Sequence, residues 1–204
     1  MRLAVCLLLA AGISSAENFT YWIQPCEGAI ASESACDAGD AELARWALGA
    51  WEKAGRSAVK FEESKEERAR IRVFWASGRM RLYGEARPVV VDGKRGAEIY
   101  VNPDVAQLGA EIHTAAASDR LLRDAIVYLT CLHESGHGIG LSHTGKFDDI
   151  MYSFGYGGDI VEYFERYRRK LGAREDIRRH SGISADDRQQ LVSLFRKPPD
   201  AGLP

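Results

Sequence analysis

Apolar residues recur at helical spacing in three stretches of the chain, residues 40–53, 119–132 and 160–171. In each stretch they return every three or four positions, which places them on one face of a helix. The middle stretch has a continuous apolar stripe, formed by Leu121, Leu122, Ala125, Ile126, Leu129 and Leu132. It predicts a buried helix. Ser118 is the expected N-cap of this helix, and Asp119 suits the positive end of its dipole.

Two shorter runs, residues 59–61 and 71–75, alternate between apolar and polar positions, as half-buried β-strands do. Residues 88–91 and 98–102 are two further candidate strands. Asp92-Gly93 separates these two candidates, and this dipeptide is a strong hairpin signal. The pattern therefore predicts a domain that combines helices with several strands.

The composition agrees with one globular domain. The chain has 204 residues, of which 46% are hydrophobic and 27% charged, and a chain of this size can bury an adequate core. Its formal net charge is −2, whereas proteins that bind nucleic acid usually carry a basic excess. A nucleic-acid partner is therefore not expected.

Residues 1–16 have the pattern of a secretory signal peptide. Arg2 precedes the apolar run 3–13, and the small residues 14–16 follow it. We expect cleavage after Ala16, which places the mature protein in the periplasm or outside the cell. A membrane anchor is the alternative, but this run is too short to span a bilayer comfortably, and no later stretch is long enough. No stable membrane insertion is expected after the signal is removed.

The candidate chemistry lies in residues 133–143, at the end of the buried helix. His133 and His137 are four residues apart, so both project from one helical face and can bind one metal ion. His143 would point away from that ion on a continuing helix. Gly140 supplies the necessary break, because glycine adopts a left-handed backbone conformation at little cost.

Three neutral imidazoles are typical ligands of a catalytic zinc ion. They leave the fourth position open for water, whose pKa then falls towards neutrality. Glu134 lies beside the ligands in the sequence and is the candidate general base that takes the proton of this water. Histidines of an ordinary protein core do not explain all of these placements together.

The extended motif HExxHxxGxxH, followed by a methionine, resembles that of the metzincin metallopeptidases. Met151 follows His143 by eight residues, and this short gap with the Met151-Tyr152 pair is most similar to the matrixin branch. Weaker similarities to a matrixin catalytic domain cover most of the mature chain. They lie at residues 19–23, 47–51, 59–62, 71–75 and 184–187.

The resemblance implies an α+β fold: a metzincin-like catalytic domain over residues 17–198, with a twisted, mostly parallel sheet, three main helices and a zinc cleft. Met151 would form an apolar floor below the metal. The strand at 98–102 would border the cleft, where an extended peptide could add to its edge. Residues 199–204 are expected to form a loose tail.

Several positions depart from the matrixin pattern. The region 78–113 offers only His113, so the second, structural zinc site of matrixins is not expected. Calcium binding stays open, because no calcium loop is evident in the spacing of Asp92, Asp104, Asp148 and Asp149. Ser153 stands where proline is expected, which leaves the shape of the specificity pocket open. We also expect no inhibitory prodomain between Ala16 and Phe19.

Residues 155–183 form an additional stretch relative to the family. Its apolar positions at helical spacing are Ile160, Phe164, Tyr167 and Leu171, and its basic positions are Arg166, Arg168, Arg169 and Lys170. Two interpretations stay open. An amphipathic surface helix is favoured, and a basic rim that selects acidic substrates is the alternative.

Three cysteines remain after removal of the signal peptide, so one must stay unpaired within the chain. Cys26 and Cys36 flank a small-residue loop, and a disulfide between them would restrain it. Cys131 precedes His133 by two residues, which aims it away from the metal and into the packing. The surroundings of Cys26 are also similar to the propeptide cysteine that blocks zinc in latent matrixins, but Cys26 follows the first strand instead of preceding it.

The sequence thus predicts a secreted, monomeric zinc metalloendopeptidase that acts on protein or peptide substrates. Its zinc ligands are His133, His137 and His143, and its general base is Glu134. A secreted zinc hydrolase of a non-peptide amide is one alternative. The other is a zinc-dependent binding module without turnover, which the presence of Glu134 disfavours.

Overall fold

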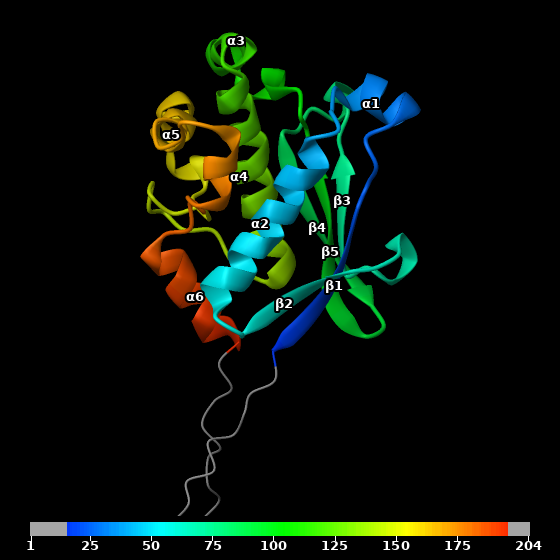
Figure 1. The fold of residues 1–204 in the computed structure, drawn as a ribbon. Helices are drawn as coiled ribbons and strands as arrows, with labels where there is room; N and C mark the ends of the chain where they lie inside the picture. The colour runs from blue at the N-terminus through cyan, green and yellow to red at the C-terminus, as the bar shows by residue number, and fades with distance from the viewer. Residues whose placement is uncertain (1–15, 196–204) are drawn as a thin grey trace, which may run out of the picture.

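The computed structural model describes residues 16–195 as an α+β domain built on a five-stranded sheet (Figure 1). The strands are β1 Glu17–Ile23, β2 Val59–Glu63, β3 Ile71–Trp75, β4 Gly84–Val91 and β5 Lys94–Val101. The helices are α1 Gly28–Ser34, α2 Asp40–Gly55, α3 Ala110–Ser118, α4 Arg120–Ile139, α5 Ile160–Arg168 and α6 Ala185–Phe195. The expected signal peptide, apart from Ala16, and the expected loose tail lie outside the described residues.

The sheet has the strand order β2-β1-β3-β5-β4, in which only β4 runs antiparallel to its neighbour. The predicted hairpin is confirmed: Asp92 and Gly93 both have positive φ, 51° and 73°, as a tight two-residue turn between twisted strands requires. One prediction about the sheet was wrong. The strand around 98–102 is not at the edge, because β4 pairs along its outer side and is itself the edge strand.

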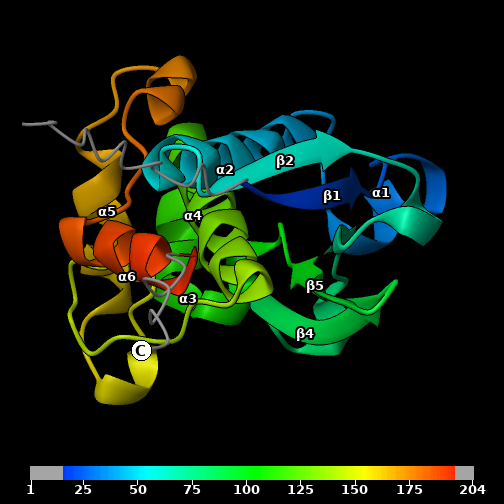
Figure 2. The same ribbon diagram turned by 90° about the horizontal axis from the view of Figure 1, so that it is seen from below.

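Two long helices cover one face of the sheet. Figure 1 shows α2 and α4 crossing that face, and Figure 2 shows α5 and α6 on the side of α4 that is turned away from the sheet. Leu43, Ala47 and Trp51 of α2 are fully buried, as their spacing predicts. The indole nitrogen of Trp51 donates a hydrogen bond to the Leu132 carbonyl, 2.9 Å away, which fixes α2 against the middle of α4.

The three main helices expected from the resemblance are α2, α4 and α6, and three short helices accompany them. The loop between Cys26 and Cys36 contains α1, and the expected disulfide closes it. Cys131 is free and buried. Within residues 16–195, no helix has both the length and the apolar character needed to cross a bilayer.

The start of α4 differs from the prediction by one residue. Ser118 is the last residue of α3, and its hydroxyl donates to the carbonyl of Ala115. Asp119 is the N-cap of α4, because its carboxylate accepts a hydrogen bond from the amide of Leu122, 3.0 Å away. With α3 ending immediately before α4, a single residue separates the helices, and that residue must be the cap.

Candidate metal centre

The C-terminal end of α4 carries the first two histidines of the motif. His133 and His137 project from one face of this helix, and Gly140 ends it in a left-handed conformation with φ 110°. The amide of Leu141 donates back to the Gly136 carbonyl, 2.9 Å away, so the chain reverses direction at this point. The reversal brings His143 over the face that holds the other two imidazoles. The break predicted from Gly140 is therefore present.

The three imidazoles converge through their Nε2 atoms. His143 Nε2 lies 3.2 Å from His133 Nε2 and 3.0 Å from His137 Nε2. Ligand nitrogens about 2.0–2.1 Å from a tetrahedral zinc ion are separated by roughly 3.3 Å, so this set fits zinc with little movement. In the part of the chain that the structure describes, these histidines are the one group of three metal-binding side chains.

The opposite ring nitrogens of His133 and His137 are held by backbone carbonyls. His133 Nδ1 donates to Ile150 at 2.6 Å, and His137 Nδ1 donates to Leu141 at 2.9 Å. These bonds fix the tautomer in which the Nε2 lone pair is free for a metal. Burial, with the neighbouring imidazoles, lowers the pKa of His133 to about 4 and also lowers the pKa of His143. The neutral, ligating form of both rings is therefore favoured at neutral pH.

Glu134 faces the same cleft from the adjacent helical position and is only 6% exposed. Burial, and secondarily the charge of Glu85, raises the pKa of its carboxyl group to about 8 in the metal-free protein. Gly84 of β4 lies directly over this carboxylate: a Cβ atom there would lie 2.6 Å from Glu134 Oε1. Only glycine lets the edge strand approach the helix so closely.

Met151 is completely buried beneath the same end of α4. Its sulfur fills the space beside Gly136, where an added Cβ atom would lie 2.4 Å from it. The turn around Met151 is held from α6 by Asp187, whose carboxylate accepts the amides of Ile150 at 2.8 Å and Met151 at 3.2 Å. This role of Asp187 was not predicted from the sequence, in which the residue stands out only as part of the matrixin-like stretch 184–187.

The three histidines and Glu134 line an open cleft of about 400 Å³. One wall is the start of β4 with the residue before it, and the other is the segment that follows Met151. The lining residues are Tyr83, Gly84, Glu85, Ala86, His133, Glu134, His137, His143, Tyr152, Ser153, Phe154 and Gly155. Tyr152 is buried and donates its hydroxyl to the Gly157 carbonyl at 2.6 Å, which agrees with a packing role.

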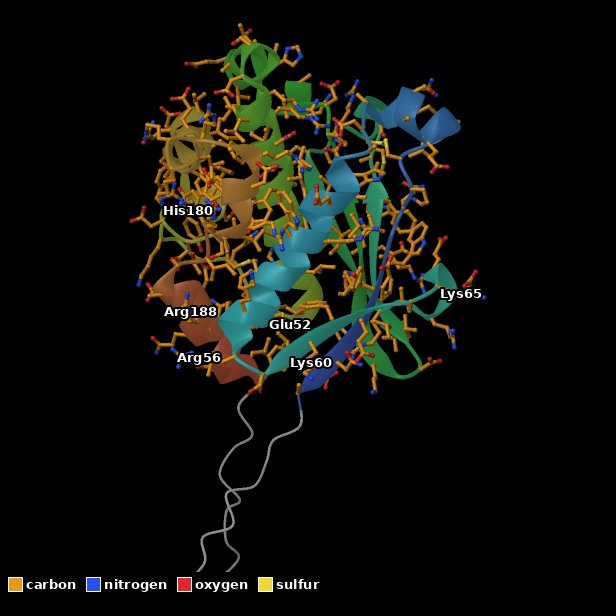
Figure 3. The ribbon with its side chains drawn as sticks, in the orientation of Figure 1. Glu52, Arg56, Lys60, Lys65, His180 and Arg188 are labelled. Atoms are coloured by element: carbon orange, nitrogen blue, oxygen red, sulfur yellow. A yellow bond between two sulfur atoms is a disulfide. The ribbon has the colours of Figure 1, made fainter. Side chains whose placement is uncertain are left out.

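Other candidate ligands stay apart from this centre. His113 is exposed on α3, and His180 lies on the α5 side of the molecule, away from the sheet (Figure 3). Cys26 is bonded to Cys36 and is not a zinc ligand here. The four aspartates considered for calcium form no common cluster among residues 16–195.

The fold and the site together define a metzincin-type domain, in which a helix that carries the HExxH motif ends at a glycine, and this helix and a buried methionine turn lie beside a mostly parallel sheet. Within that class the chain belongs to the matrixins: residues 14–159 match the matrixin family of M10 peptidases. Matrixins are zinc-dependent metallopeptidases. No curated protein matches the chain significantly. Helix α5 begins immediately after the matched region.

Proposed function

We propose that this protein is an exported zinc metalloendopeptidase with His133, His137 and His143 as zinc ligands and Glu134 as the general base. The observation that carries the proposal is the convergence of three Nε2 atoms beside a buried carboxylate in an open cleft. A structural zinc site is usually closed by a fourth protein ligand, whereas this site offers three. Membership of the matrixins agrees with protein substrates.

Bound zinc supplies Lewis acidity, which polarises the scissile carbonyl group and increases the acidity of water in the cleft. Glu134 accepts a proton from the attacking water and returns it to the nitrogen of the leaving amine. The edge strand β4 binds the substrate backbone as an added strand, because no other strand within residues 16–195 pairs with its outer side and its first residues line the cleft.

The variant Glu134→Gln tests the assignment of the general base. It should bind zinc as the wild type does and cleave an unfolded protein substrate about a hundredfold more slowly or worse. Zinc content and peptide cleavage are measured on the same preparations. Glu111→Gln, an exposed exchange on α3, is the matched control and should retain full activity. Undiminished cleavage by Glu134→Gln would remove Glu134 from the mechanism.

The same assay separates the alternatives. A wild-type protein that binds zinc and hydrolyses small amides but no peptide would be a different hydrolase. One that binds zinc and cleaves neither would be a binding module.

Export is the second part of the proposal. The leader pattern supports it, and so does the position of β1, which begins at Glu17, directly after the expected cleavage site. Matrixins are typically secreted or extracellular. N-terminal sequencing of the protein recovered from outside the cytoplasm should begin at Glu17. Recovery of the chain only inside the cell with Met1 intact would contradict export.

A further inference from the structure

A second, narrow pocket continues from the floor of the cleft next to His133. Four of its lining residues also line the cleft: Tyr83, His133, Tyr152 and Phe154. The others come from two helices: Leu129 and Thr130 from α4, Tyr163 and Phe164 from α5. The free space inside is about 10 Å³, which holds roughly one water molecule. The pocket is therefore almost completely filled by the protein itself.

Aromatic side chains from α5 do most of this filling. Tyr163 and Phe164 are 5% and 2% exposed, and the Tyr163 ring lies 5.1 Å from that of Phe154 in an edge-to-face arrangement. Tyr152 packs on Tyr163 at 6.2 Å between ring centroids. Aromatic pairs of this kind are stabilised beyond the area they bury.

Hydrogen bonds hold the two tyrosines in place. The Tyr163 hydroxyl donates to the carbonyl of Asp149 at 3.1 Å, and the Tyr152 hydroxyl donates to the carbonyl of Gly157 at 2.6 Å. Both rings are thus fixed at their polar ends as well as by packing. Moving either ring to open the pocket would break these hydrogen bonds, so the closed arrangement is favoured.

Helix α5 is itself firmly attached. Asp159 caps it by accepting the amides of Val161 and Glu162, and the guanidinium of Arg166 lies 4.6 Å from the centre of the Tyr163 ring. Two of its arginines pair with acids outside the helix, Arg166 with Asp148 and Arg168 with Asp119, and its C-cap residue Arg169 pairs with Glu162 of the helix itself. None of these arginines lines the cleft. The helix therefore contributes an aromatic surface to the site, and the basic-rim interpretation is not supported.

We propose that Tyr163 and Phe164 of α5 determine substrate specificity by closing this pocket. The inference rests on the proposed peptidase function. At one of the two positions that flank the scissile bond, the substrate side chain points into the floor beside His133. A space of one water admits glycine, alanine or serine there, whereas a leucine or phenylalanine side chain must displace well-packed rings, and such overpacking is unfavourable.

The first test is a cleavage-site profile on a peptide library. The zinc-loaded wild type should show a small residue at one flanking position. Phe164→Ala removes a ring from the pocket and leaves the hydroxyl of Tyr163 in place. For peptides with leucine or phenylalanine at that position, it should raise kcat/KM at least tenfold relative to peptides with alanine there. Phe164→Leu, a milder exchange, covers the case in which the alanine variant does not fold.

The matched control is Tyr167→Ala. Tyr167 is a buried aromatic residue of the same helix, but it stacks on Tyr128 and does not line the pocket. Its exchange should lower stability by a similar amount and leave the cleavage profile unchanged. A wild-type enzyme that cleaves peptides with large residues at both flanking positions as fast as those with alanine overturns the inference and leaves the peptidase function intact.

A binding measurement makes the test independent of turnover. Acetohydroxamate and its phenylacetyl analogue, which both bind metal but differ in the size of the attached group, are titrated into the zinc-loaded proteins. Phe164→Ala should bind the aromatic compound at least tenfold more tightly than the wild type does, with little change for acetohydroxamate. Equal affinities in both proteins contradict a closed pocket. The expected binding pattern without any peptide cleavage supports the pocket and overturns the peptidase function alone.

Discussion

The two ends of α4 are held by opposite kinds of interaction. At the N-terminal end, Arg123 pairs with the buried carboxylate of Asp40, and Arg120 and Arg174 both contact Asp124. At the C-terminal end, the imidazoles of the metal centre bond to uncharged backbone carbonyls. One end of the helix is fixed by compensated charges, and the other by neutral hydrogen bonds.

The difference follows from what each end must do. Charged pairs hold α4 to α2 and to the segment after α5, and their charges stay in place. A metal site needs neutral imidazoles with a free lone pair, and carbonyl partners provide this without adding charge to the cleft. Stability and metal binding thus depend on separate ends of one helix, so mutations at the two ends should affect them separately.

The largest change in stability is expected at the N-terminal end of α4, where the charged pairs lie. Asp40→Ala leaves the guanidinium of Arg123 buried without its closest partner, and breaking such a pair costs about 3–5 kcal/mol of unfolding free energy. We expect about 3 kcal/mol, because Asp37 and Asp124 also lie near Arg123. Chemical denaturation measures the loss. The folded variant should bind zinc normally, because His137 lies roughly 20 Å further along the helix.

Glu42→Ala is the control for this experiment. Glu42 lies on α2, as Asp40 does, and pairs with Arg174. Because its side chain is half exposed, its removal should lower the free energy of unfolding by less than about 1 kcal/mol. Equal losses from both exchanges would mean that burial does not distinguish the two pairs.

At the C-terminal end of α4, a mutation should weaken zinc binding and leave stability nearly unchanged. His137→Ala should lower zinc affinity more than about a hundredfold, because losing even an outer partner of a ligand costs 10–100-fold. The stability of the metal-free protein should change little. Competition with a chelator measures the affinity, and His113→Ala on the exposed face of α3 is the control. Unchanged zinc binding in His137→Ala would rule out the three-histidine centre.

Features that depend on local interactions could be predicted from the sequence alone. The stripe of α4, the spacing of His133 and His137, and the break at Gly140 all depend on residues within a few turns of each other. The hairpin at Asp92-Gly93 is local as well. Helical periodicity and turn chemistry act over such distances, so these features could be predicted from one chain.

Features that depend on distant partners were missed. Asp187 holds the turn at Met151 from 36 residues away, and no local pattern reveals this. The edge position of β4 depends on the order of all five strands. The filling of the pocket by Tyr163 was equally hidden, because helical spacing shows that α5 has an apolar face but not which surface that face meets.

The smallest predicted effect concerns the residue that begins α4. Asp119→Ala removes the acceptor for the amide of Leu122 and a partner of Arg168, and loss of an N-cap costs about 1 kcal/mol. Ser118→Ala, the matched control, removes only an exposed hydroxyl bonded within α3 and should leave stability nearly unchanged. Chemical denaturation of both variants distinguishes the cap in the structure from the cap that the sequence suggested.

The effect of Asp119 should depend on pH. Burial raises the pKa of its carboxyl group, but the amide of Leu122 and the guanidinium of Arg168 outweigh this, so the pKa falls below its usual value of 3.8. A group with a lowered pKa in the folded state stabilises the protein above the pKa of the unfolded chain, and this contribution is lost as pH falls through the folded-state pKa. The stability difference between wild type and Asp119→Ala should therefore be full at neutral pH and shrink in acid. A difference that stays constant into strong acid would show that packing, and not the charged cap, makes Asp119 favourable at the start of α4.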